Sequence, residues 1–230
     1  YAERDSRVRV IHKRNGGLSD ARNAGLDIAE GNYIIFTDSD DFLHRDCLKI
    51  QYENLVQADA DIAICDYQIH YAGQTIVNSL TNQINIVEGQ GITAQLYENP
   101  GMLIVAWNKL YKRFLLEGIR YPVGRLHEDE AVIHEILVRC RRIVLTDAKL
   151  YYYRQRENSI MGQDSDKSVQ DAVYAYQRRI SFFAKQNMIM DEAPAPRPAY
   201  SVLDNYMLRL TSDFRFAPWQ DAIAEYIKEM

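Results

Sequence analysis

Short apolar runs alternate with helix-periodic segments along the first part of the chain. Runs of strand length, rich in β-branched and aromatic residues, occupy 8–11, 32–36 and 61–67. Between and after them, 19–28 and 46–58 carry apolar residues at helical spacing. A strand, a helix and a second strand in this order are typical of βαβ units. We therefore expect an α/β fold with a mostly parallel sheet flanked by helices.

Further short elements follow: a helix at 91–98 and strands at 143–145 and 150–153. Beyond them the pattern becomes that of amphipathic helices. We expect an α/β domain over residues 1–162 and a C-terminal helical extension over residues 163–230.

Composition narrows the class of protein. The 230 residues are 47% apolar and 26% charged, as in a soluble globular protein. The net charge of −5 argues against nucleic acid as the partner. Cys47, Cys65 and Cys140 have no paired spacing, which suits buried thiols in a reducing compartment. No run approaches the roughly 20 apolar residues of a membrane helix. We expect a cytoplasmic protein and leave open peripheral contact with the inner face of the membrane.

Three carboxylates follow the strand at 32–36. Asp38, Asp40 and Asp41 surround Ser39 where the apolar run ends. Open α/β sheets bind ligands at the carboxyl ends of their strands, and clustered carboxylates there need a cation to relieve their repulsion. The leading hypothesis is a divalent metal that holds a phosphorylated ligand. The alternative is a solvated acidic loop that caps the next helix.

A second acidic cluster occupies 127–130, directly before apolar residues at helical spacing. Acidic residues are favoured in the first turn of a helix, but this preference does not explain four consecutive ionisable groups. If the cluster is helical, Glu128 and Asp129 cannot face the same way. A polar, cationic loop follows at 154–160, either as a solvated turn or as a phosphate-binding segment.

Five motifs, in order along the chain, resemble those of the inverting family-two glycosyltransferases with the GT-A fold. They are the segments 15–25, 31–41, 106–111, 125–130 and 153–160. The resemblance implies a GT-A-like, Rossmann-related sheet. Relatives begin with a strand, a helix and a second strand that bind the nucleotide, whereas Tyr1 falls just before their third strand. We therefore expect an N-terminally truncated domain, whose exposed sheet edge a second copy of the chain could cover as a homodimer.

The resemblance also implies roles for the acidic residues. Asp38 and Asp40 match a D-x-D motif that holds Mn²⁺ or Mg²⁺ on the donor diphosphate. Asp129 matches the general base, with Glu128 as the neighbouring candidate. The remaining positions are implied to be donor-side, namely Asn15, Arg22, Arg154, Arg156 and Ser159, or acceptor-side, namely Trp107. Arg22 could instead form a surface ion pair and Trp107 could belong to the core.

The expected reaction is metal-assisted transfer of a sugar, with inversion, from a nucleotide-sugar to an acceptor hydroxyl. Uridine diphosphate is the commonest carrier in the family, and the expected acceptor is a cell-surface glycan or a lipid-linked one. Two alternatives remain. A phosphatase could use Asp38 as its nucleophile, although its motif normally continues with glycine and here continues with Asp41-Phe42. A catalytically incomplete fragment could act only as a binding module.

Overall fold

The computed structural model describes residues 1–71, 80–155 and 166–186. All of them belong to one compact unit that runs from Tyr1 to Ile189. Helix α6 (Asp166–Lys185) is therefore part of the same unit as the sheet. The predicted boundary at 162/163 falls outside the described residues, as does the chain beyond 186, and the division into two parts stays a prediction.

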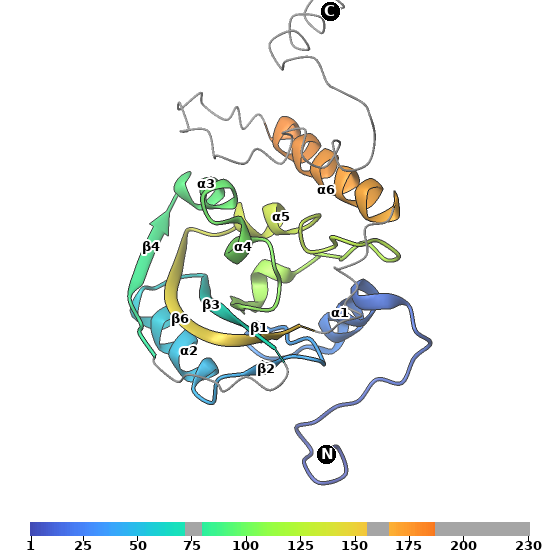
Figure 1. Cartoon of the computed structure of the whole chain (residues 1–230), viewed down its shortest axis with the longest axis vertical. Helices are drawn as coiled ribbons and strands as arrows, with labels where there is room; N and C mark the ends of the chain where they lie inside the picture. Colours follow the sequence, from blue (N-terminus) through green and yellow to red (C-terminus); the bar gives the residue numbers. More distant parts are fainter. Residues whose placement is uncertain (72–79, 156–165, 187–230) are drawn as a thin grey trace, which may run out of the picture. The chain divides into compact units, whose positions relative to one another are not determined.

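A single sheet forms the centre of the unit (Figure 1). Its order is β1-β5-β3-β6-β2, and β4 also pairs with β6. The strands are β1 (Tyr33–Ile35), β2 (Phe42–Leu43), β3 (Ile62–His70), β4 (Ile84–Glu88), β5 (Lys109–Lys112) and β6 (Arg142–Arg154).

The sheet is mixed rather than mostly parallel, which corrects one part of the prediction. Among the described strands, only β3 and β6 pair in parallel, while β1–β5, β3–β5, β2–β6 and β4–β6 are antiparallel. Direction depends on how each connection returns to the sheet, and apolar runs of strand length occur in both kinds of sheet. The α/β class itself, with helices flanking the sheet, is confirmed.

The predicted strand at 8–11 is wrong. Residues 1–16 form no strand, and Val8, Val10 and Ile11 are 41%, 57% and 43% exposed. The first βαβ unit is therefore absent, and β1 is an edge strand that pairs with β5. A strand needs a partner as well as a suitable composition, and in the described part of the chain residues 8–11 have none. Whether a second copy covers this edge stays a prediction.

The two strands predicted at 143–145 and 150–153 are one long strand, β6. It runs beside β3 over its whole length, and the pairing shifts register where Cys65 faces Thr146 and Asp66 faces Lys149. The extra residues on β6 are Asp147 and Ala148 at this shift and Leu150 at a second shift, between Asp66 and Tyr67. The sequence alone shows this irregular stretch as a turn-like interruption.

Helices cover the sheet through three apolar clusters. On α2 (Cys47–Gln57), Leu55 packs with Ala63 of β3 and Val144 of β6. A larger cluster joins β3 and β6 to four further elements, which are α3 (Gly91–Glu98), α4 (Pro100–Leu103), η1 (Arg113–Leu116) and α5 (Ile133–Leu137). The third surrounds Trp107 and contains the buried thiols of Cys47 and Cys65.

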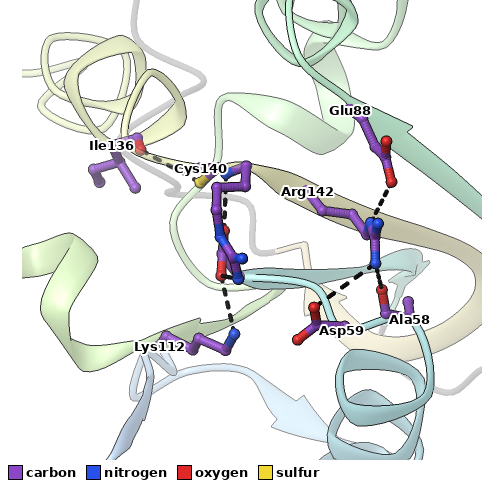
Figure 2. Close-up of polar contacts among 9 residues, drawn as sticks. Ala58, Asp59, Glu88, Lys112, Ile136, Cys140 and Arg142 are labelled. Atoms are coloured by element: carbon purple, nitrogen blue, oxygen red, sulfur yellow. Dashed lines mark hydrogen bonds and ion pairs between the residues drawn. The ribbon is translucent and has the colours of Figure 1, made fainter.

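Ion pairs and hydrogen bonds connect the first residues of β3 and β6 to neighbouring elements. Asp61, 1% exposed, accepts hydrogen bonds from Lys112 Nζ at 2.9 Å and from the backbone N–H of Arg141 at 2.8 Å. Figure 2 shows the neighbouring Arg142, which pairs with Glu88 and donates to the carbonyl of Ala58. Burial raises the pKa of Asp61, but the hydrogen bonds outweigh it and hold that pKa below its usual value.

In the part of the chain that the structure describes, no helix has both the length and the apolar character needed to cross a membrane.

Candidate functional site

The acidic loop lies between β1 and β2 and is tied to β6 by one tyrosine. The hydroxyl of Tyr151 donates to Asp41 Oδ2 at 2.7 Å and accepts the backbone N–H of Asp38 at 3.2 Å. The other oxygen of Asp41 accepts the backbone N–H of Arg154 at 2.8 Å. Since Tyr151 is fully buried, these bonds join both ends of the acidic loop to the interior of the sheet.

Arg22 connects the acidic loop to the second acidic cluster. It lies on α1 (Gly17–Ile28) and is 6% exposed. Its Nη1 donates to Glu128 Oε1 at 2.5 Å and its Nη2 to Asp38 Oδ1 at 3.3 Å. The guanidinium also lies over the rings of Phe36 and Tyr121, at 5.8 and 5.3 Å from their centroids. Two carboxylates 90 positions apart in sequence therefore share one buried cation.

The segment that carries the second acidic cluster is a turn, not the first turn of a helix. Helix α5 begins only at Ile133, and His127 has a φ of 54°. Isolated bonds of helical spacing run from the N–H of Ala131 to His127 O and from the N–H of Ile133 to Asp129 O, but the segment before Ile133 forms no regular helix. The helix-based argument about the directions of Glu128 and Asp129 therefore does not apply, and their contacts decide between them.

The three consecutive carboxylates have different partners. Glu128 pairs with Arg22, and Glu130 pairs with Arg179 of α6 at 3.0 Å. Between them, Asp129 accepts the backbone N–H of Glu130 at 2.8 Å and forms no ion pair with any described residue. Burial raises the pKa of Asp129 most, while Arg22 lowers it by a smaller amount. A carboxylate with a raised pKa is a better proton acceptor.

Lys109 is a fully buried cation close to this cluster. Its Nζ donates to Met102 O at 2.6 Å, to Asn108 Oδ1 at 2.7 Å and to Val105 O. Burial lowers the pKa of Lys109 to about 7, opposed by the charge of Asp129. Lys109 thus holds together the loop that carries Trp107.

The carboxylates of the acidic loop suit a hard divalent cation that a ligand also coordinates. Within the described residues, no group of three or more His, Cys, Asp or Glu side chains could hold a metal alone. Asp41 is held by Tyr151 and Arg154, and Asp38 also contacts Arg22; Asp38 and Asp40 are the two carboxylates at the D-x-D positions. Mg²⁺ usually binds through one or two carboxylates together with phosphate oxygens, so this donor set fits a metal shared with a diphosphate.

Comparison with known proteins identifies the family. The sequence model described as Glycosyl transferase family 2 matches residues 1–120, just over half of the chain. The chain belongs to glycosyl transferase family 2. The phosphatase alternative is thereby removed. Asp38, Asp40 and Arg22 lie inside the matched region, and the cluster at 128–130 lies beyond it.

Relatives of this family-2 chain include two proteins of Streptococcus pneumoniae. It is 31% identical to Glycosyltransferase GlyA over 84% of this chain and 29% of that protein. It is also 31% identical to Glycosyltransferase GlyG, over 79% of this chain and 64% of that one. A crystal structure of Staphylococcus aureus TarS residues 1–349 in complex with UDP-GlcNAc has a TM-score of 0.64 at 19% identity, covering 87% of this chain and 58% of that one. This likeness confirms the predicted GT-A-like fold. The chain spans less than two thirds of each of these proteins.

The other residues predicted for the family-2 site lie as follows. Asn15 accepts the backbone N–H of Gly17 at 3.0 Å and so shapes the start of α1. Trp107 is 7% exposed and stacks on Tyr151 at 4.1 Å, as a core residue would. The guanidinium of Arg154 lies over Phe42. Arg156 and Ser159 lie outside the described residues. The binding roles of all five stay predictions.

Four contributors to the site carry no assigned role from the sequence alone: Tyr151, Lys109, Glu130 and Arg179. Tyr151 reads as strand packing within a run of three tyrosines. The position of Arg179 could have been noticed in the sequence. The buried residues of α6 lie four positions apart, on the face that a helix turns to the core, and they are Asp171, Ala175, Arg179 and Phe183. Charged residues at such positions indicate buried ion pairs.

Proposed function

We propose that this family-2 chain transfers a sugar from a uridine diphosphate sugar to an acceptor hydroxyl with inversion. The observation that carries the proposal is the contrast within the second acidic cluster. Glu128 and Glu130 each pair with an arginine, whereas Asp129, between them, forms no ion pair with any described residue. Burial raises the pKa of Asp129 and that of Glu128, so the ion pairs rather than the pKa distinguish the two. Both flanking side chains are engaged, so Asp129 is the member of the cluster suited to accept a proton.

Asp129 acts as the general base in this proposal. Its carboxylate takes the proton of the acceptor hydroxyl while the hydroxyl oxygen forms a bond to the anomeric carbon. The bond from that carbon to the diphosphate oxygen breaks, and the diphosphate leaves with the electron pair. Attack opposite to the leaving group inverts the configuration. Glu128 instead fixes Arg22, whose second nitrogen reaches Asp38 and so links the base to the acidic loop.

Asp38 and Asp40 are the residues proposed to hold Mn²⁺ or Mg²⁺. When bound with the donor, such an ion would supply positive charge to the departing diphosphate. The protein supports this by holding the acidic loop in place. Tyr151 and the backbone of Arg154 fix Asp41, the residue next to Asp40.

UDP-GlcNAc is the first donor to test, because the structural neighbour TarS was crystallised with it. The acceptor is proposed to be a glycan or a lipid-linked glycan. This part rests on the family resemblance rather than on any contact in the site.

Calorimetric titration with UDP, with and without Mn²⁺, tests the donor site, and release of UDP from UDP-GlcNAc tests the chemistry. We expect Mn²⁺-dependent binding that Asp40→Asn abolishes. Asp129→Asn should keep that binding and lose UDP release about 100-fold or more, as expected for loss of a general base. Glu128→Gln serves as the matched carboxylate change. If Glu128→Gln abolishes release while Asp129→Asn does not, the assignment of the base is wrong.

If UDP binds and no variant or wild-type chain releases it from UDP-GlcNAc with any acceptor, the binding-module alternative is favoured.

A further inference from the structure

Helix α6 contacts the segment that carries the base, residues 125–130, which we call the base segment. Figure 1 shows α6 running past α5 and the loop before it. At the start of the base segment, Arg125 Nη1 and the backbone N–H of Leu126 both donate to Asp171, at 2.8 and 2.9 Å. His127 Nε2 lies 3.1 Å from Ser168 Oγ. These contacts hold His127, the residue in the left-handed conformation.

The same helix holds the other end of the base segment. Arg179 Nη2 donates to Glu130 Oε1 at 3.0 Å, and the two side chains are 5% and 10% exposed. The backbone N–H of Glu130 in turn donates to Asp129 Oδ1. A shift of Glu130 therefore moves the group that orients the Asp129 carboxylate.

The partners of Asp171 keep its side chain ionised although it is buried. It is 1% exposed, and besides Arg125 and Leu126 it accepts a bond from Lys167 at 2.5 Å. Burial raises the pKa of Asp171, but these hydrogen bonds outweigh it and leave that pKa well below its usual value. Asp171 thus stays ionised and holds the base segment throughout the working pH range.

We propose that α6 is a positioning element for catalysis, with Arg179 and Asp171 as positioning residues that act on Asp129 through the base segment. This inference rests on the proposed role of Asp129 as base. It differs from simple packing, because the two contacts lie on either side of Asp129. Arg179 ends on its neighbour Glu130, and Asp171 ends on Arg125 and Leu126 at the start of the base segment. It also gives α6, which lies beyond the region matched by the family model, a part in the active site.

The chain offers a matched control on the same helix. Arg178 pairs with Glu135 of α5 at 2.7 Å, with side chains 32% and 21% exposed. Arg178→Met removes an arginine one position away, from a pair that does not end on the base segment. Arg179→Met is compared with it, and the double variant Arg179→Met with Glu130→Gln separates the loss of the contact from the burial of an unpaired carboxylate.

Two measurements on the full chain test the proposal. Hydrogen–deuterium exchange should rise about ten-fold for the amides of residues 125–131 in Arg179→Met, as in local unfolding, and not in Arg178→Met. In the UDP-GlcNAc assay, Arg179→Met should lower kcat about 10- to 100-fold, the effect of a misplaced catalytic group, with the KM for UDP-GlcNAc within about two-fold. The double variant should restore thermal stability and not kcat.

The outcomes are separable. Equal exchange and equal kcat in Arg179→Met and Arg178→Met would overturn the inference. Recovery of kcat in the double variant would also overturn it, because burial of an unpaired charge would then explain the whole effect. If the wild-type chain releases no UDP, the proposed function fails, and the exchange contrast at residues 125–131 still decides whether α6 holds the base segment.

Discussion

Replacing Tyr151 by phenylalanine tests whether one hydroxyl holds the acidic loop in place. The change removes the donor to Asp41 Oδ2 and the acceptor of the Asp38 N–H while leaving the ring that stacks on Trp107. A hydrogen bond to a charged group contributes about 1.5–3 kcal/mol, and the groups left behind remain partly buried. We expect the free energy of unfolding to fall by about 2 kcal/mol.

The same change should weaken donor binding. Asp41 keeps its bond from the backbone of Arg154, so the loop loses two of its three hydrogen bonds to β6 described above. If about 1.4 kcal/mol of the lost stabilisation is needed to order the loop around the metal, the Kd for UDP with Mn²⁺ rises about ten-fold. Loss of the hydrogen bond from Tyr151 also raises the pKa of Asp41 further.

Urea unfolding followed by circular dichroism and calorimetric titration of UDP with Mn²⁺ measure both effects. Tyr153→Phe is the matched control, because Tyr153 stacks on the same Trp107 and its hydroxyl bonds no other described residue. If the two variants behave alike in stability and in UDP binding, the hydroxyl of Tyr151 does not organise the acidic loop and the reasoning is refuted.

Three further predictions concern buried ionisable side chains. Lys109→Met removes a cation that lowers the pKa of Asp129, so the pKa of Asp129 should rise. The loss of kcat/KM at low pH should then begin at a higher pH than in wild type. An unchanged pH profile would show that Lys109 does not influence the base. Burial lowers the pKa of His134 to about 4, so on acidification the unfolded state binds a proton before the folded state does. The free energy of unfolding of wild type should therefore fall by at most about 3 kcal/mol between pH 6.5 and 4. Urea unfolding at both pH values should show no such loss from this residue in His134→Leu. Asp61→Asn weakens the hydrogen bond from the half-buried Lys112 and should cost about 2 kcal/mol of stability. Because the pKa of Asp61 is lowered, wild type loses the same contribution only in acid, and UDP affinity should be unchanged at temperatures where both proteins are folded.

Elements with strong local signals could be predicted from the sequence. The helix at 91–98 and the helix within 46–58 were found where periodicity places them, because an amphipathic helix is recognisable from its own residues. The strand predicted at 8–11 failed because strand formation depends on a partner elsewhere in the chain. The irregular stretch of β6 at Asp147 and Ala148 was interpreted as a break between two strands. The residues on both sides pair with β3, and this pairing cannot be seen in the sequence of β6 alone.

The candidate site, too, was predictable only in part. The positions of the acidic residues were readable as motifs, and the family resemblance already favoured Asp129 over Glu128 as the base. The ion pairs that distinguish the two were not readable, because Arg22 and Arg179 lie 106 and 49 positions from their glutamate partners. No local pattern reports such distances. The left-handed His127 also had no warning in the sequence, because that conformation is commonest for glycine; in the structure the His127 side chain contacts Ser168 of α6.

The pairing of the two glutamates has a further consequence for the carboxylate between them. Three adjacent ionised carboxylates without partners would repel one another and raise each pKa. The two buried ion pairs oppose that repulsion, although burial and the charge of Asp129 still raise the pKa of Glu128. Breaking either pair leaves a buried charge uncompensated, a change that typically costs about 3–5 kcal/mol. Arg22 and Arg179 therefore act together: Arg22 joins the base segment to the acidic loop, and Arg179 joins it to α6.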